Sequence, residues 1–517
     1  MQMLSALDAT FIYLESEHSP MAIGAVYVID AKEAPKGFSY ETWRLLVQSR
    51  LGLSKVFRER LVEVPWDLAF PYWIRDPGFE LGAHLPVTTL HEPGGMAELM
   101  QVAANTWGQV LDRGRPLWDI TFVEGLDSVP GISKGSFALV TRVHHAAVDG
   151  KASAEIMTAL LDTTPAIRDV EVEDSWEPEE LPSTLGIITR SWSQFGLKAV
   201  DLAGFVGKAA VEAANLEVDK WVKQIEPPPR LLTAPATIFN QSIDSVRTFW
   251  GRNFDFERIR AIRKAVIGVT VNDVVLAICA GGLRSYLAER GELPSKPLVA
   301  MAPISVRSET EGTGNEVSAM LVSLATDIDD PLTRLLHIRA NTKRSKIHAS
   351  ALPANRITEF LPSETLAAAA RVYTRTRLGG FHRPFFNVTI TNVPGPPVPL
   401  YAAGARIHSA FGMAPILDGL GLILVVLSYH GRISIGISSC QQIVPDPDNM
   451  ADCFSRSLDE LELAISRADP ATLASAYQDG ETEPRYRKGP LKAFHDASEA
   501  LDKAIESLEG QVIDDKC

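Results

Sequence analysis

The sequence has few cysteines, no metal-binding pattern and no excess of positive charge, and each absence excludes a class of function. Its four cysteines are far apart, which predicts neither a disulfide framework nor a zinc site and is typical of a reducing compartment. His-Glu-x-x-His, Cys-x-x-Cys and phosphate-loop patterns are missing, so we expect no metal and no nucleotide hydrolysis. The net charge of −14 at pH 7 argues against nucleic acid as a partner but leaves room for an anionic substrate, because the local field at a site can oppose the net charge.

The sequence also lacks the pattern of a signal peptide and that of a membrane-spanning segment. Asp8, Glu15 and Glu17 interrupt the apolar residues near the N-terminus, which argues against a signal peptide. The longest strongly apolar run, over residues 420–427, is much shorter than the roughly 20 residues that cross a bilayer. We therefore expect a cytoplasmic protein, with any contact to a membrane or lipid droplet made at its surface.

The length of 517 residues is too great for one ordinary domain and sufficient for two with sizeable cores. An acidic stretch with prolines over residues 171–180 predicts an exposed connection, and a helical pattern follows it up to the three prolines at 227–229. We predict domains over residues 1–165 and 236–480, a crossover over 166–235 and an amphipathic C-terminal tail over 481–517.

Two adjacent histidines lie where a predicted strand ends. Apolar or β-branched residues at positions 137, 139, 141 and 143 have the period of a strand, and residues 151–161 have the apolar face of a helix. His144 and His145 therefore lie in a turn on a rigid support, where a substrate can reach them. A histidine can take a proton from a hydroxyl group and return it, so the position suggests general-base catalysis, although a structural role is commoner for a histidine at the end of a strand.

The complete pattern His-His-x-x-x-Asp-Gly over residues 144–150 resembles the signature of the acyl-CoA-dependent acyltransferase superfamily. That superfamily includes chloramphenicol acetyltransferase, carnitine acyltransferases, peptide-synthetase condensation domains and bacterial wax ester synthase/diacylglycerol acyltransferases. The resemblance implies that His145 is the general base, with His144 beside it. It also implies that Asp149 points away from the substrate and holds the turn through an arginine, for which Arg307 is the candidate. Gly150 suits the tight passage from turn to helix.

Three further motifs, in the expected order, resemble the wax ester synthase/diacylglycerol acyltransferase branch. The first is Pro116-Leu117-Trp118, which we interpret as structural support for the site. In the second, Asn272-Asp273, a capping box with Thr270 gives Asp273 a structural role, and Asn272 is a candidate polar positioner or oxyanion donor. The third, Asn-Val-Pro-Gly-Pro over residues 392–396, predicts a sharp loop with Asn392 at the edge of the site.

A fourth pattern leads to a different hypothesis, which we reject. Residues 131–135 match the Gly-x-Ser-x-Gly motif of serine hydrolases. That motif needs a strand before it and a helix after it, whereas here a strand follows. We therefore predict that Ser133 lies in the turn of a hairpin and is not a nucleophile.

The resemblance covers about residues 4–465 and implies an α/β fold. We expect two chloramphenicol-acetyltransferase-like domains, with mixed sheets flanked by helices and an active-site tunnel at their interface. The implied activity is O-acyl transfer from acyl-CoA, a co-substrate, to diacylglycerol and/or a long-chain fatty alcohol, forming triacylglycerol or wax ester without another cofactor. Two alternatives stay open: a stand-alone condensation-type enzyme that uses carrier-bound acyl groups, and a non-catalytic lipid-binding protein. The motifs specify neither the acceptor nor the oligomeric state.

Overall fold

The computed structural model describes most of the two predicted domains. The described residues are 1–34, 38–148, 159–168, 176–180, 234–305, 317–349 and 383–469, together with the positions 156, 367, 370–372, 374, 376, 377 and 473. Asp149, Gly150 and Arg307 lie outside the described residues, as do the helical part of the crossover and the C-terminal tail.

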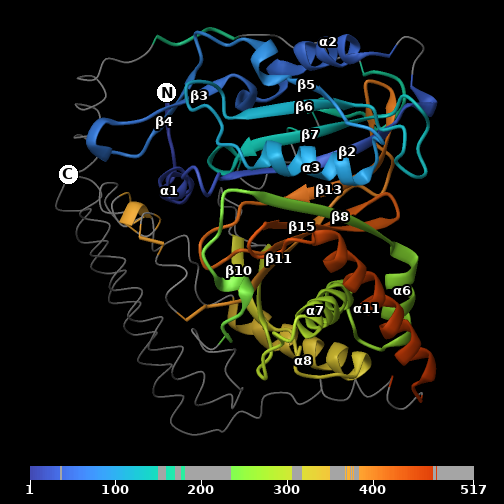
Figure 1. Ribbon diagram of the computed structural model, residues 1–517. Coiled ribbons are helices and arrows are strands. Elements are labelled where there is room, and N and C mark those ends of the chain that lie inside the picture. The colour runs from blue at the N-terminus through green and yellow to red at the C-terminus, as the bar shows by residue number, and fades with distance from the viewer. Residues whose placement is uncertain are drawn as a thin grey trace, which may run out of the picture.

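Two six-stranded mixed sheets form the body of the protein (Figure 1). The first is antiparallel apart from its β5–β6 pair, and its order is β12 (Tyr401–Ala402), β13 (Ala405–Met413), β2 (Ala22–Asp30), β7 (Phe137–His144), β6 (Trp118–Glu124) and β5 (Val87–Thr89). In the second, β11 runs parallel to both neighbours, and the order is β10 (Val317–Ser323), β9 (Val299–Ser305), β11 (Val388–Pro394), β14 (Ile423–Tyr429), β15 (Arg432–Cys440) and β8 (Arg247–Asp255). A small third sheet contains β1 (Gln2–Met3), β4 (Tyr72–Arg75) and β3 (Glu59–Val62).

Helices cover the outer faces of both large sheets and fill the space between them (Figure 1). The longer helices are α1 (Ala6–Leu14), α2 (Tyr40–Arg50), α3 (Met96–Trp107), α6 (Phe256–Ala265), α7 (Val271–Glu289), α8 (Pro331–Ala349) and α11 (Pro447–Arg467). Short 3-10 helices are η1 (Ala31–Glu33), η2 (Leu51–Leu53), η3 (Lys55–Phe57), η4 (Pro65–Asp67), η5 (Leu81–His84), η6 (His145–Ala147) and η7 (Ile238–Asn240). Helix α2 lies over the first sheet, α3 lies between the sheets, and α7, α8 and α11 lie on the far side of the second sheet.

The period of two in β7 places its alternate residues in different cores, as the sequence predicts. Phe137 and Leu139 pack in the cluster under α2, whereas Ala138 and Val140 pack in the larger cluster that includes α3 and the second sheet. Helix α7 is the centre of that larger cluster. Of the helices in the described residues, α7 alone has the length and hydropathy of a membrane span, and 72% of that stretch is buried inside the protein.

Strands from the C-terminal half complete the first sheet. β13 pairs antiparallel with β2 and crosses the β14–β15 hairpin, where the Ser434 hydroxyl donates to the Ala410 carbonyl at 2.6 Å. Glycines permit this close approach, because a Cβ atom on Gly436 would lie 2.1 Å from the Gly412 carbonyl oxygen. The second half of the chain thus contributes β12 and β13 to the first sheet across the predicted division of the chain, whose boundaries stay a prediction.

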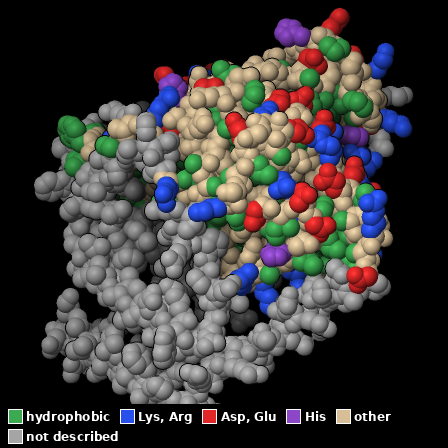
Figure 2. All heavy atoms as spheres, turned by 60° about the horizontal axis from the view of Figure 1, so that its bottom comes forward, with side chains coloured by type: hydrophobic (Ala, Val, Ile, Leu, Met, Phe, Trp, Pro, Cys, Tyr) green, Lys and Arg blue, Asp and Glu red, His purple; other side chains and the backbone are tan. Residues whose placement is uncertain are grey.

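Charge on the surface is mixed. Figure 2 shows acidic and basic side chains interspersed over the face on the side of α8 and α11, with no stripe of one sign in its described part. A protein that binds nucleic acid through its phosphates usually gathers lysine and arginine on one face. This face therefore offers no such footprint.

Candidate active site

The backbone at the two histidines is fixed by the neighbouring strand and by the segment before β2. β7 ends at His144, and η6 begins at His145, so the predicted passage from strand to turn is present. The His144 amide donates to the Leu117 carbonyl at 2.9 Å, and the His145 amide donates to the Met21 carbonyl at 2.8 Å. Residues from two distant segments thus hold the turn.

The side chain of His144 positions this turn from inside the protein. The residue is fully buried, and its Nδ1 accepts a hydrogen bond from the Ala146 amide at 3.0 Å, which caps η6. Because Nδ1 accepts, the neutral ring carries its proton on Nε2. That nitrogen lies 3.1 Å from Oε2 of Glu15. The imidazole therefore links a carboxylate to the backbone beside His145.

Glu15 is the residue of this site that the sequence analysis missed. Its side chain is 3% exposed, and it accepts hydrogen bonds from the Met21 amide and from two nitrogens of Arg113. Burial by itself raises the pKa of Glu15, but the close contact with His144, the charge of Arg113 and the hydrogen bond from the Met21 amide outweigh it and hold the pKa below its usual value. Glu15 is therefore ionised at neutral pH and fixes the orientation of the His144 ring.

His145 has a different environment. Its ring stacks on Phe11 of α1, with centroids 3.9 Å apart and planes inclined by 16°. Burial lowers the pKa of His145 to about 4, and the neighbouring His144 adds to the effect. The imidazole is therefore neutral at physiological pH, which is the state that a general base requires.

The Pro-Leu-Trp motif supports the site from β6. Leu117 supplies the carbonyl that accepts from the His144 amide, and the Trp118 indole donates to the Phe57 carbonyl at 2.9 Å. The Trp118 ring also stacks on His84, with centroids 4.6 Å apart. Pro116 forms an isolated bridge with Arg60. Pro116, Leu117 and Trp118 are all buried, which agrees with a structural role.

The Asn-Asp motif opens α7. Thr270 and Asp273 form the capping box that the sequence predicts, and the second oxygen of Asp273 accepts from the Thr342 hydroxyl at 2.6 Å. The side-chain amide of Asn392 donates through Nδ2 to the Asn272 side-chain oxygen at 3.4 Å, so the structure brings two of the motifs together. Within the described residues, no hydrogen bond joins this asparagine pair to His145.

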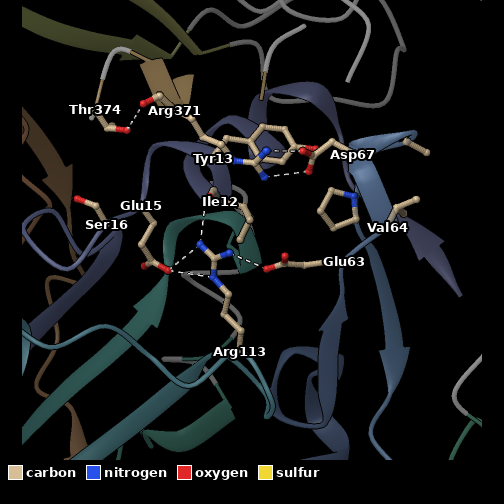
Figure 3. Close-up of a pocket in the computed structure, with 12 residues that line it drawn as sticks. Ile12, Tyr13, Glu15, Ser16, Glu63, Val64, Asp67, Arg113, Arg371 and Thr374 are labelled. Carbon is tan, nitrogen blue, oxygen red and sulfur yellow. Dashed lines mark hydrogen bonds and ion pairs between the residues drawn. The ribbon is translucent and has the colours of Figure 1, made fainter. Parts of the chain in front are cut away.

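A pocket of about 210 Å³ adjoins the buried carboxylate (Figure 3). Glu15 connects this pocket to the histidines, because it lines the pocket and faces His144. Arg113 bridges Glu15 to Glu63, and Arg371 pairs with Asp67 (Figure 3). The lining residues are Ile12, Tyr13, Glu15, Ser16, Glu63, Val64, Asp67, Ala69, Pro71, Arg113, Arg371 and Thr374. In the described part of the chain, no group of three histidine, cysteine or acidic residues could hold a metal ion.

Ser133 lies in a hairpin turn, as predicted. The β6 and β7 strands on either side of it are antiparallel, and Gly131 and Gly135 both have positive φ angles. The Ser133 hydroxyl donates to Asp30 at 2.6 Å, so it is held by a carboxylate and does not stand at the start of a helix.

Two protein-family models match the chain. The wax ester synthase/diacylglycerol acyltransferase catalytic domain matches residues 4–275, and the WS/DGAT C-terminal domain matches residues 313–462. A putative diacylglycerol O-acyltransferase of Mycobacterium tuberculosis is 31% identical over 488 residues, which are 93% of this chain and 93% of that protein. A second one from the same organism is 32% identical over 464 residues, which are 89% of this chain and 100% of that protein.

Solved structures have the same fold. A wax ester synthase/diacylglycerol acyltransferase from Marinobacter aquaeolei VT8 aligns with a TM-score of 0.63 and 28% identity, over 90% of this chain and 100% of that chain. The first condensation domain of the calcium-dependent antibiotic synthetase aligns with a TM-score of 0.51 and 13% identity, over 89% and 95% of the two chains, a likeness of fold alone. The predicted α/β architecture of mixed sheets flanked by helices is confirmed, and the tunnel stays a prediction.

Proposed function

The chain belongs to the wax ester synthase/diacylglycerol acyltransferase family and is an acyltransferase, and on that premise we propose that it moves a fatty acyl group from acyl-CoA to diacylglycerol and/or a long-chain fatty alcohol, with His145 as the general base. The observation that carries this proposal is the state of His145. Its ring is neutral, stacked on Phe11 and carried on a turn with a fixed backbone.

The proposed reaction needs one proton carrier. His145 takes the proton of the acceptor hydroxyl, and the oxygen attacks the thioester carbonyl carbon. The tetrahedral oxyanion then collapses and breaks the carbon–sulfur bond, and the histidinium returns its proton to the departing CoA thiolate. A donor must stabilise the oxyanion, and Asn272 is our candidate, with Asn392 holding its side chain.

The other motif residues keep structural or positioning roles in this proposal. Glu15 and His144 hold the turn, and Leu117, the residue before β6, anchors it through its carbonyl. Asp149, Gly150 and Arg307 lie outside the described residues, so the predicted ion pair between Asp149 and Arg307 stays a prediction.

The deciding experiment follows CoA release from palmitoyl-CoA by the purified chain, with hexadecanol or dipalmitoylglycerol as acceptor. We expect acceptor-dependent release that His145→Ala abolishes and that the exposed control His91→Ala leaves unchanged. Release that survives His145→Ala contradicts the role of the base. Transfer from an acyl-carrier protein without transfer from acyl-CoA favours the condensation-type alternative, and no transfer from either donor favours the non-catalytic one.

We also propose a cytoplasmic protein that contacts a membrane or lipid droplet peripherally, through Trp66. This side chain is 76% exposed in η4, on the connection between β3 and β4. Trp66 and Asp67 have φ angles of 56° and 55°, a left-handed conformation that costs roughly 1–3 kcal/mol at each non-glycine residue. Tryptophan is enriched at membrane–water interfaces. Residues of the same connection line the pocket beside Glu15, so a membrane bound through Trp66 would lie close to the candidate active site.

Sedimentation with phosphatidylcholine vesicles tests this surface. We expect Trp66→Ser to reduce the bound fraction several-fold. Leu45→Ser is the control, because Leu45 is 54% exposed on α2. Equal binding by the parent chain and the Trp66 variant contradicts the proposal.

A further inference from the structure

The segment between α1 and β2 contacts both histidines. We call residues 15–21 the bridging turn. Glu15 faces the His144 ring, and the Met21 carbonyl accepts from the His145 amide at 2.8 Å. The turn is closed by two backbone hydrogen bonds between Ser16 and Ser19, of 3.2 and 2.9 Å. A displacement of this turn must therefore displace the histidines.

The same turn is bonded to the second half of the chain. The Ser19 hydroxyl donates to the Ile416 carbonyl at 2.7 Å, in the connection between β13 and β14. The Arg247 guanidinium, at the start of β8, donates to the His18 carbonyl and to the Asp244 carbonyl. Two contacts thus join the tip of the turn to elements that lie more than 200 positions away in the sequence.

Arg247 is an unusual residue for a purely stabilising contact. It is 4% exposed, and within the described residues no carboxylate lies within ion-pair distance of it. Burying a guanidinium with no carboxylate within ion-pair distance carries a large desolvation cost, so it is a weak source of stability. Its planar fork, in contrast, fixes the direction of each hydrogen bond.

Arg247 also reaches the strand that faces His144. Its guanidinium lies 5.6 Å from the centre of the Trp107 ring, and the Trp107 indole donates to the Ala22 carbonyl at 3.1 Å. Ala22 is the register partner of His144 in the β2–β7 pair. The arginine therefore acts on the histidines along two routes, through the His18 carbonyl and through Trp107.

We propose that Arg247 and Ser19 are positioning residues, which hold the bridging turn against the second half of the chain and thereby set the placement of His145. Neither side chain touches the reacting atoms in this account. The catalytic consequence rests on the proposed function, whereas the effect on the placement of His145 does not. Loosening either contact frees the Met21 carbonyl to move, and with it the backbone and ring of His145.

The test uses the full chain with Ser19→Ala and Arg247→Lys. Ser466→Ala and Arg252→Lys are matched controls, because Ser466 also donates to a backbone carbonyl and Arg252 lies on β8 with an exposed ion pair. The first readout is the rate at which diethyl pyrocarbonate modifies His145, measured by peptide mass spectrometry with the exposed His91 as internal standard. The second is kcat and KM for palmitoyl-CoA, at a temperature at which all chains are folded.

We expect both variants to modify at His145 at least threefold faster than the parent, with His91 unchanged. We also expect kcat to fall at least threefold while KM stays within twofold, and the controls to match the parent. If His145 is modified at the same rate in the folded Ser19→Ala and Arg247→Lys chains as in the parent chain, the proposal is overturned. If Arg247→Lys does not fold, the result for Ser19→Ala alone decides. A parent chain without acyl transfer overturns the proposed function, and the modification rates still decide the positioning role.

Discussion

The acid limit of catalysis follows from the surroundings of His145, and removing Phe11 should move it. Phe11 covers one face of the imidazole at 3.9 Å, and burial is the main cause of the low pKa of about 4. In the chain with Phe11→Ala, water reaches the ring, and we expect the pKa to rise to about 5.5, part of the way to its ordinary value.

The expected change in the pKa of His145 is large enough to be detected in the pH dependence of kcat/KM. At pH 5.5 a base with a pKa of about 4 is about 97% neutral, whereas a base with the ordinary value of 6.5 is only about 9% neutral. The kcat/KM of the parent should therefore be almost the same at pH 5.5 as at pH 7.5. The Phe11→Ala chain should lose about half of its kcat/KM over the same interval.

The assay measures kcat/KM for palmitoyl-CoA between pH 5 and 8, with CoA quantified chromatographically so that detection does not depend on pH. Phe38→Ala is the control, because Phe38 stacks on Phe137 in the cluster under α2. A tenfold fall in the kcat/KM of the parent chain between pH 7.5 and 5.5 refutes the claim that burial lowers the pKa of His145. A Phe11→Ala profile that coincides with the parent profile refutes the role of Phe11.

Three further predictions concern stability, measured by urea unfolding. Asp162→Ala should cost about 3–5 kcal/mol, because it leaves the buried Arg50 without its carboxylate, and Asp112→Ala in the exposed pair with Arg115 should cost less than about 1 kcal/mol; equal costs contradict this. Gly251→Ala should cost about 1–3 kcal/mol, since its Cβ would lie 2.3 Å from the buried Phe411 ring, whereas Gly82→Ala, with open space around it, should be near neutral. Because the pKa of Glu15 is lowered in the folded chain, its contribution to stability is present above its unfolded pKa and is lost as the pH falls through the lower folded pKa. The Glu15→Gln chain should therefore lose less stability than the parent between pH 5 and pH 3. An unchanged dependence of stability on pH would contradict the role of the buried carboxylate.

The elements that the sequence predicts correctly depend on near neighbours. The alternation in β7 and the capping box of Thr270 with Asp273 involve residues within a few positions of one another, so local preferences determine them. The two-residue turn between β14 and β15 is equally local, because His430 and Gly431 have positive φ angles of 41° and 76°.

The missed features depend on distant partners. Glu15 is a charged residue in an apolar stretch, and its role appears only when folding brings Arg113 to it across 98 positions. In the same way, nothing within residues 405–413 distinguishes a strand of the second sheet from one that joins β2. Long-range pairing of this kind is set by the packing of whole layers, which a local pattern does not encode.

The pairing of β13 with β2 has a consequence for biosynthesis. When residues 1–165 have left the ribosome, β2 can pair with β7, but its other edge stays open until β13 is made. At roughly 5–20 residues per second, translation from residue 165 to the end of β13 at residue 413 takes roughly 12–50 s, during which an unpaired edge invites association with other chains. The bond from Ser19 of the bridging turn to the Ile416 carbonyl also forms only at this late stage. A nascent or truncated chain therefore lacks the complete support of its histidines, and assembly of the site is delayed until residue 416 of the 517-residue polypeptide has been made.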